Sequence, residues 1–255
     1  MWPGEAIIDW LTALGLFLGL LAGLEICFYL GRKARARRSE HPDQLATIQA
    51  AMLGLLALLL GFSFALAAGR FSDRKNLIVQ EANAIGTAWL RCDLLPEAPR
   101  RQVRDLLKLY VAQRIAFYDA QDHQTKVAAT AESERLHGQI WAFVSAAGQS
   151  SPVVASVLWP PFNEMIDLHA TRVAAARRHM PAMLLLLLLA CSLVSVAAVG
   201  YGCGVAGKRN VVLTTALTFL ISGVLWAIID MDHPRKGLIR VGQQPMLDLQ
   251  KSLKR

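Results

Sequence analysis

The chain has 255 residues, 54% of them hydrophobic, and a formal net charge of +8. Its mean hydropathy of +0.36 argues against an ordinary soluble domain, because the excess apolar residues are concentrated in a few long blocks. In a soluble protein this positive charge would suggest a nucleic-acid partner. Here the Lys and Arg residues cluster beside the apolar blocks, where anionic lipid headgroups explain them. We therefore expect the lipid bilayer as a partner, and no nucleic acid.

Four long apolar runs predict membrane-spanning helices. They cover about 7–30, 46–68, 181–204 and 211–230. A helix needs roughly 20 residues to cross about 30 Å of hydrocarbon, and lipid leaves only helices or the strands of a closed barrel as spanning structures. Continuous runs such as Leu184–Leu189 lack the alternation of barrel strands, so helices are expected.

The first run is expected to be retained as a helix. Glu5 and Asp9 precede its core, and no Lys or Arg comes before it. A signal peptide has a basic segment before its apolar region. Here the basic residues follow the run instead.

The charges of the loops indicate an orientation across the membrane. Residues 31–45 hold five basic residues, and residues 205–210 hold Lys208 and Arg209 on the same side. The positive-inside rule assigns this side to the cytoplasm, and the first helix usually dominates. We therefore expect a multi-pass protein of the cell inner membrane, with its large domain and both termini in the periplasm. Basic residues on the other face favour the opposite orientation: Arg70, Arg74, Lys75, Arg172, Arg177, Arg178, Arg235, Lys236 and Arg240.

The segment between the second and third runs is expected to be helical throughout. No proline separates Gly69 from Pro96, so the second helix should run on past the membrane, with an apolar stripe within 76–92. Further helices are expected over about 100–120 and 127–147. Another should open at Ser151 and be interrupted at Pro160–Pro161.

The predicted fold class is an all-α integral membrane protein, with four transmembrane helices and an external helical bundle inserted between helices 2 and 3. Its parts are expected at 1–69 (transmembrane helices 1 and 2), 70–178 (external helical domain), 179–230 (transmembrane helices 3 and 4) and 231–255 (external amphipathic tail). The tail should begin with a turn. It should then pack on the external domain or lie along the membrane surface.

No constellation typical of an enzyme is found. Glu134 and His137 match half of a carboxylate-bridged di-metal motif, but its other half is missing, so we interpret them as a surface pair. Glu164 and Asp167 share a helix face with which Arg172 can pair. There is no glycine-rich phosphate loop, no nucleophile elbow and no C-x-x-C spacing. We expect no catalytic residue, no cofactor and no metal.

Two features of the spans could serve ion passage. Glu25 lies inside the first run, where an acidic residue is costly and by default functional, although it could also reach headgroups or pair with Arg32. A polar stripe on the fourth run either lines a water-filled path or bonds neighbouring helices. The stripe comprises Thr215, Thr218, Ser222, Trp226 and Asp230.

Glycines in the spans indicate close helix packing. Gly15, Gly19 and Gly23 recur every fourth residue in the first run and predict contact within the subunit or between subunits. The triplet Gly200-Tyr-Gly202 is similar to a potassium-channel filter, but it ends a spanning helix. We interpret its tyrosine as an interfacial residue between packing glycines.

Three segments carry a resemblance to a known family. They are the run Gly61–Gly86, which includes Glu81-Ala-Asn83-Ala, the segment Asn163–Ala170, and the tail Asp232–Gln244. Together they resemble a bacterial family of domains of unknown function that is labelled bestrophin-like. The matching positions are Glu81, Asn83, Asn163, Glu164, Asp167, Asp232, Pro234 and Gly237. The resemblance implies a four-span fold with a helical loop, and a nominal link to bestrophins, which are oligomeric anion channels.

The leading functional hypothesis is a homo-oligomeric ion channel whose path, lined by the fourth or the first span, carries inorganic ions. The alternative is a non-conducting membrane scaffold or envelope sensor that binds a partner through its external helical domain.

Overall fold

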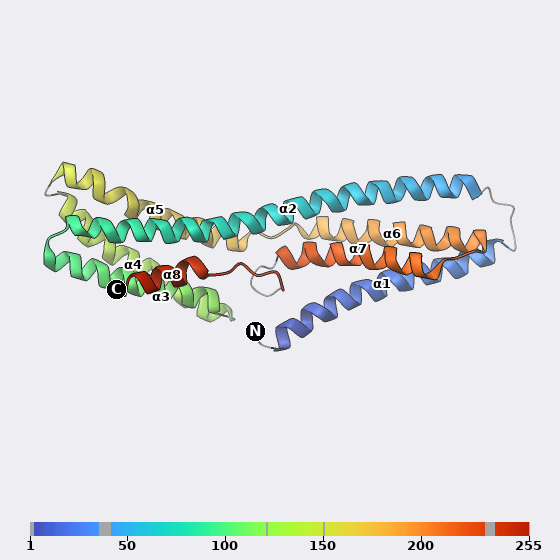
Figure 1. The fold of residues 1–255 in the computed structure, drawn as a ribbon, viewed down its shortest axis with the longest axis horizontal. Helices are drawn as coiled ribbons and strands as arrows, with labels where there is room; N and C mark the ends of the chain where they lie inside the picture. The colour runs from blue at the N-terminus through green and yellow to red at the C-terminus, as the bar shows by residue number, and fades with distance from the viewer. Residues whose placement is uncertain (1–2, 36–41, 121, 150, 233–237, 255) are drawn as a thin grey trace. The chain divides into compact units, whose positions relative to one another are not determined.

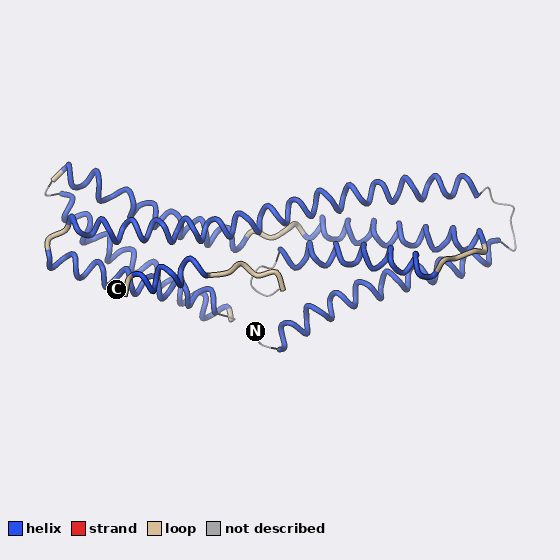
Figure 2. Tube along the Cα trace, viewed as in Figure 1, coloured by secondary structure: helices blue, strands red, loops and turns tan. Residues whose placement is uncertain are grey.

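A computed structural model describes residues 3–35, 42–120, 122–149, 151–232 and 238–254. Within these ranges the chain forms helices and no strand (Figure 2). In chain order (Figure 1) the helices are α1 (Pro3–Arg35), α2 (Pro42–Arg91), η1 (Cys92–Leu94), α3 (Glu97–Asp119), α4 (His123–Gln149), α5 (Pro152–Arg177), α6 (Ala182–Ala206), α7 (Val211–Asp232) and α8 (Gln244–Ser252).

The chain divides into two compact units. Unit 1 comprises Met1–Phe71 and His179–Arg240, and unit 2 comprises Ser72–Arg178 and Val241–Arg255. In the described part of the chain, four helical stretches are long and apolar enough to cross a membrane. Each overlaps one of the four predicted runs, so the prediction of four spans is confirmed at the level of length and composition.

Unit 1 is held together by an apolar core and by a close approach of α1 to α6. Its core includes the fully buried Leu24, Leu188 and Ile228. At the crossing, a Cβ atom on Gly200 or Gly204 would overlap the backbone of α1. Small residues at these positions therefore let the two helices touch backbone to backbone.

The predicted glycine stripe on α1 is used only in part. A Cβ atom on Gly23 would stand 2.6 Å from Leu193 Cδ1, whereas no atom lies within 4 Å of that position on Gly15 or Gly19. Packing within the protomer therefore explains Gly23 and leaves the other two glycines beside open space.

Unit 2 contains the helices that the sequence predicts, with one difference. As expected, α2 continues without a break to Arg91. The predicted interruption at Pro160–Pro161 is wrong, because α5 runs unbroken from Pro152 to Arg177. Leu158 and Phe162 flank the prolines and are fully buried, and this packing holds the helix through two residues that have no backbone N–H.

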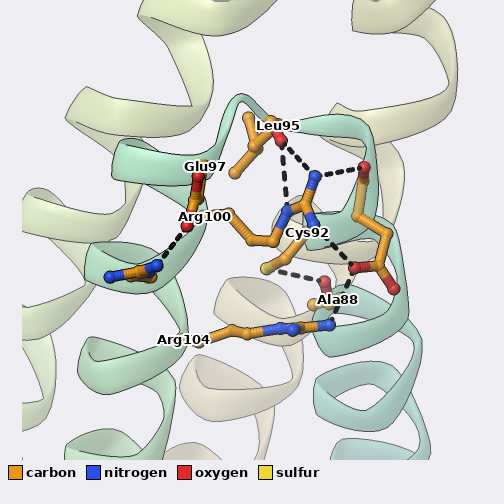
Figure 3. Close-up of polar contacts among 8 residues, drawn as sticks. Ala88, Cys92, Leu95, Glu97, Arg100 and Arg104 are labelled. Carbon is orange, nitrogen blue, oxygen red and sulfur yellow. Dashed lines mark hydrogen bonds and ion pairs between the residues drawn. The ribbon is translucent and has the colours of Figure 1, made fainter.

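At the C-terminal end of α2, side chains donate hydrogen bonds to backbone carbonyls (Figure 3). Arg100 donates to the Leu95 carbonyl from Nε at 3.2 Å and from Nη2 at 3.0 Å. The same Nη2 donates to the Asp93 carbonyl at 3.2 Å, and Cys92 Sγ donates to the Ala88 carbonyl at 3.3 Å. These bonds connect the side chains of Arg100 and Cys92 to backbone carbonyls in the region where α2 and η1 end.

The C-terminal tail belongs to unit 2 from Val241 onward. The Tyr118 hydroxyl donates to the Val241 carbonyl, and Leu249 of α8 lies beside Gly86. The tail therefore packs on the helical unit, one of its two predicted positions. The predicted turn after Asp232, with Pro234 and Gly237 of the family motif, lies outside the described residues.

Candidate functional site

The core of unit 2 contains a buried polar cluster centred on Glu81 of α2. The side chain of Glu81 has no solvent-exposed area. Its Oε1 accepts hydrogen bonds from the Tyr110 hydroxyl at 2.6 Å and from Arg114 Nε at 2.8 Å. Arg172 Nη1 of α5 donates to Oε2. One carboxylate thus joins α2, α3 and α5 through charge-assisted bonds in an apolar interior.

Arg172 also reaches the segment before α8. Its Nη2 lies 3.5 Å from Gln243 Oε1. The expectation that Arg172 pairs with Glu164 and Asp167 is wrong, because its guanidinium points into the core, whereas those acidic residues lie on the exposed face of α5 together with Asn163.

Two histidines complete the cluster beside Tyr110. The ring centroids of His137 on α4 and His169 on α5 lie 4.8 Å apart, and that of Tyr110 lies 4.7 Å from His137. Both histidines are buried, with 7% and 4% of their surface exposed. The interpretation of His137 as part of a surface pair is therefore wrong, and only Glu134 of that pair is exposed.

The environment of the cluster fixes the protonation of two of its groups. Burial and the nearby Arg114 lower the pKa of His137 to about 4, so its ring is neutral at pH 7. Burial and the charge of Glu81 raise the pKa of Tyr110 well above its ordinary value, so its hydroxyl remains a donor.

The polar residues of α7 face the interior of unit 1. Thr218 Oγ1 donates to the Thr214 carbonyl at 2.9 Å, and Ser222 Oγ donates to the Phe219 carbonyl at 2.9 Å. Thr215 is partly exposed. These bonds within one helix satisfy buried hydroxyl groups and need no water-filled path.

The two acidic residues at the end of α7 also accept hydrogen bonds within unit 1. Asp230 accepts from the backbone N–H groups of Leu238 at 2.9 Å and Ile239 at 2.7 Å. Asp232 is buried and accepts from the Met180 N–H, with both of its oxygens at 3.0 Å. Both carboxylates therefore fix backbone segments that follow or precede a span.

Glu25 pairs with Arg209 and not with Arg32, which was one of the alternatives left open by the sequence. Arg209 Nη1, in the α6–α7 loop, donates to Glu25 Oε2 at 2.7 Å. Asn83, the other motif residue on α2, is exposed. Over the described ranges, no group of three or more His, Cys, Asp or Glu residues could hold a metal ion.

The fold is shared with known proteins. A crystal structure of a point mutant of a bacterial bestrophin homologue from Klebsiella pneumoniae has a TM-score of 0.71 at 12% identity, covering 94% of this chain and 95% of that chain. A second structure of that homologue, phased with zinc, gives a TM-score of 0.68 at 13% identity, covering 93% and 95%. At such identities the likeness shows the fold alone.

Sequence comparison assigns the family. No curated protein matches the chain. The family model described as the Bestrophin-like domain matches residues 16–246, which is most of the chain. The chain therefore belongs to the Bestrophin-like family.

Proposed function

We propose that the chain is the subunit of a homo-oligomeric ion channel in the inner membrane. The observation that carries the proposal is the family match over residues 16–246, since bestrophins are known as anion channels. Four apolar helices and a bestrophin-like fold support it. The periplasmic placement of unit 2 and the termini is part of the proposal and rests on loop charge alone.

The ion path is better placed between protomers than inside one. Thr218, Ser222 and Asp230 are buried in unit 1 and bonded to the backbone, so they could line a path only if the protomer opened. A path around a symmetry axis would instead be lined by a helix face that each protomer leaves exposed.

One face of α2 has the required pattern. One set of its exposed residues is spaced alternately by three and four residues, the repeat with which helices pack around a common axis. They are Ile48, Ala51, Leu55, Leu58, Phe62, Ala65 and Gly69, all within unit 1. We infer that this face lines the path, and that the ring of Phe62, 68% exposed, narrows it.

Ion flux into liposomes tests this function. Purified oligomers should pass inorganic ions, and Phe62→Ala should increase the flux by removing an apolar constriction. Leu220→Ala is the matched control, because Leu220 of α7 is similarly exposed, at 64%, but lies outside the α2 repeat. Absence of flux for all common anions and cations in assembled oligomers would contradict the proposal, and a non-conducting scaffold or sensor would then replace it.

A further inference from the structure

The buried cluster of unit 2 has more hydrogen-bond donors than acceptors. The Glu81 carboxylate already accepts bonds from Tyr110, Arg114 and Arg172. Four such bonds use about all the acceptor sites of a carboxylate. Arg114 Nη1 is buried and has no hydrogen-bond partner among the described residues, and it carries two further N–H groups.

The two histidines place further unpaired ring nitrogens on the side of Tyr110. Both ring nitrogens of His169, and Nε2 of His137, are buried without a hydrogen-bond partner in the described part of the chain. A neutral imidazole carries one N–H and one lone pair. Tyr110 and Arg114 donate to the same oxygen of Glu81, and the ring centroid of Tyr110 lies 4.7 Å from that of His137 and 6.3 Å from that of His169. The unused groups of Arg114, His137 and His169 therefore belong to one neighbourhood.

The charge of the cluster points to the kind of ligand. Glu81 contributes one negative charge, and Arg114 and Arg172 contribute two positive charges, so with neutral histidines one positive charge remains. An uncompensated charge in an apolar interior is costly. A water molecule would bring as many donors as acceptors. An anion only accepts, and a single negative charge would balance the cluster.

We propose that unit 2 binds a small monovalent inorganic anion, of the size of chloride, among Arg114 Nη1, His137 and His169. Arg114 is fully buried and the histidines come from α4 and α5, so the ion is enclosed by three helices. This site lies in the core of unit 2 and is separate from the α2 face proposed to line the path. It would stabilise the bundle whether or not the protein conducts.

The proposal is tested by the thermal stability of the full-length protein in detergent. The protein is exchanged into gluconate, and chloride replaces gluconate at constant ionic strength. The unfolding temperature of the wild type should rise with chloride and saturate. His169→Leu, which removes a donor and keeps an apolar volume, should shift the half-maximal chloride concentration upward at least tenfold. Arg135→Gln, which changes an exposed arginine of α4, should respond like the wild type.

Two results would overturn the site: no saturable chloride response in the wild type, or an unchanged response in His169→Leu. If His169→Leu does not fold, crystals of the wild type grown in bromide decide the question. An anomalous peak within hydrogen-bond distance of Arg114 Nη1 is expected, and water or no density there would refute the proposal.

Discussion

Arg114 and Glu81 form a salt bridge in which neither side chain reaches solvent. Arg114 Nε lies 2.8 Å from Glu81 Oε1, and both side chains are 0% exposed. The pair joins α3 to α2 in the centre of unit 2. Burying two charges is costly, so such a pair adds little net stability, but removing one partner leaves the other charge uncompensated.

Glu81→Gln should therefore destabilise unit 2 strongly. The substitution leaves Arg114 and Arg172 without a carboxylate, and we expect the free energy of unfolding to fall by about 3–5 kcal/mol. Denaturant unfolding in detergent, followed by tryptophan fluorescence, measures it. Tyr110→Phe removes one hydrogen bond to the same carboxylate and should cost only about 1 kcal/mol. Equal losses in the two variants would show that charge compensation is not the main role of Glu81.

Acid should destabilise the protein through His137, which faces Tyr110, His169, Arg114 and Glu81. Its pKa is about 4 in the folded protein and roughly 6.5 in an unfolded chain. Below pH 6.5 the unfolded chain binds a proton that the folded one does not. The contribution of His137 to the free energy of unfolding is therefore constant above that pH. It falls between about pH 6.5 and 4, by about 3 kcal/mol in all.

The contribution of His137 is isolated by comparing the wild type with His137→Leu across this pH range, both in gluconate buffer. As the pH falls, the free energy of unfolding of the wild type should decrease relative to that of the variant. A difference that does not change with pH would refute the prediction.

Close helix contact predicts unequal effects for two glycines of unit 1. A Cβ on Gly204 would overlap the Phe28 carbonyl, whereas one on Gly19 meets nothing within 4 Å in the protomer. Gly204→Val should therefore lower the unfolding temperature strongly or prevent folding, because two backbones would have to separate. Gly19→Val should leave the protomer as stable as the wild type. Native mass spectrometry then shows whether Gly19→Val alters the oligomer, as expected if Gly19 contacts another subunit.

Apolar periodicity predicted the helices of unit 2 but missed its polar core. In the helix expected over about 100–120, the apolar residues Val103, Leu107, Tyr110 and Phe117 recur at helical spacing, and all four are buried. Arg114 follows Tyr110 by four residues and precedes Phe117 by three, so it shares that face. Its charge argues for a surface position, because arginine is rarely buried unless paired. A charged residue at a core position was the available signal.

The partners of these residues could not be read from the sequence. Glu81 and Arg114 are separated by 33 residues and lie on different helices. The repeat of one helix shows which face is buried, but it does not show which residue of another helix lies opposite. The continuity of α5 through Pro160–Pro161 could not be read from the sequence either. It depends on tertiary packing of Leu158 and Phe162, which outweighs the local preference to break.

The pair formed by Glu25 and Arg209 gives the last prediction. Glu25 is 39% exposed and Arg209 only 7%. Arg209 also donates from Nε to Thr214 Oγ1 at 3.1 Å and lies over the ring of Phe28. Glu25→Gln removes this one ion pair and should lower the free energy of unfolding only slightly. Arg209→Gln should cost more, since it removes three contacts of a buried group. A double-mutant cycle in detergent measures the coupling.

Because the ion pair accounts for Glu25 without a role in ion passage, Glu25→Gln should leave liposome flux unchanged. A changed flux in a variant that folds and assembles normally would place Glu25 on the ion path.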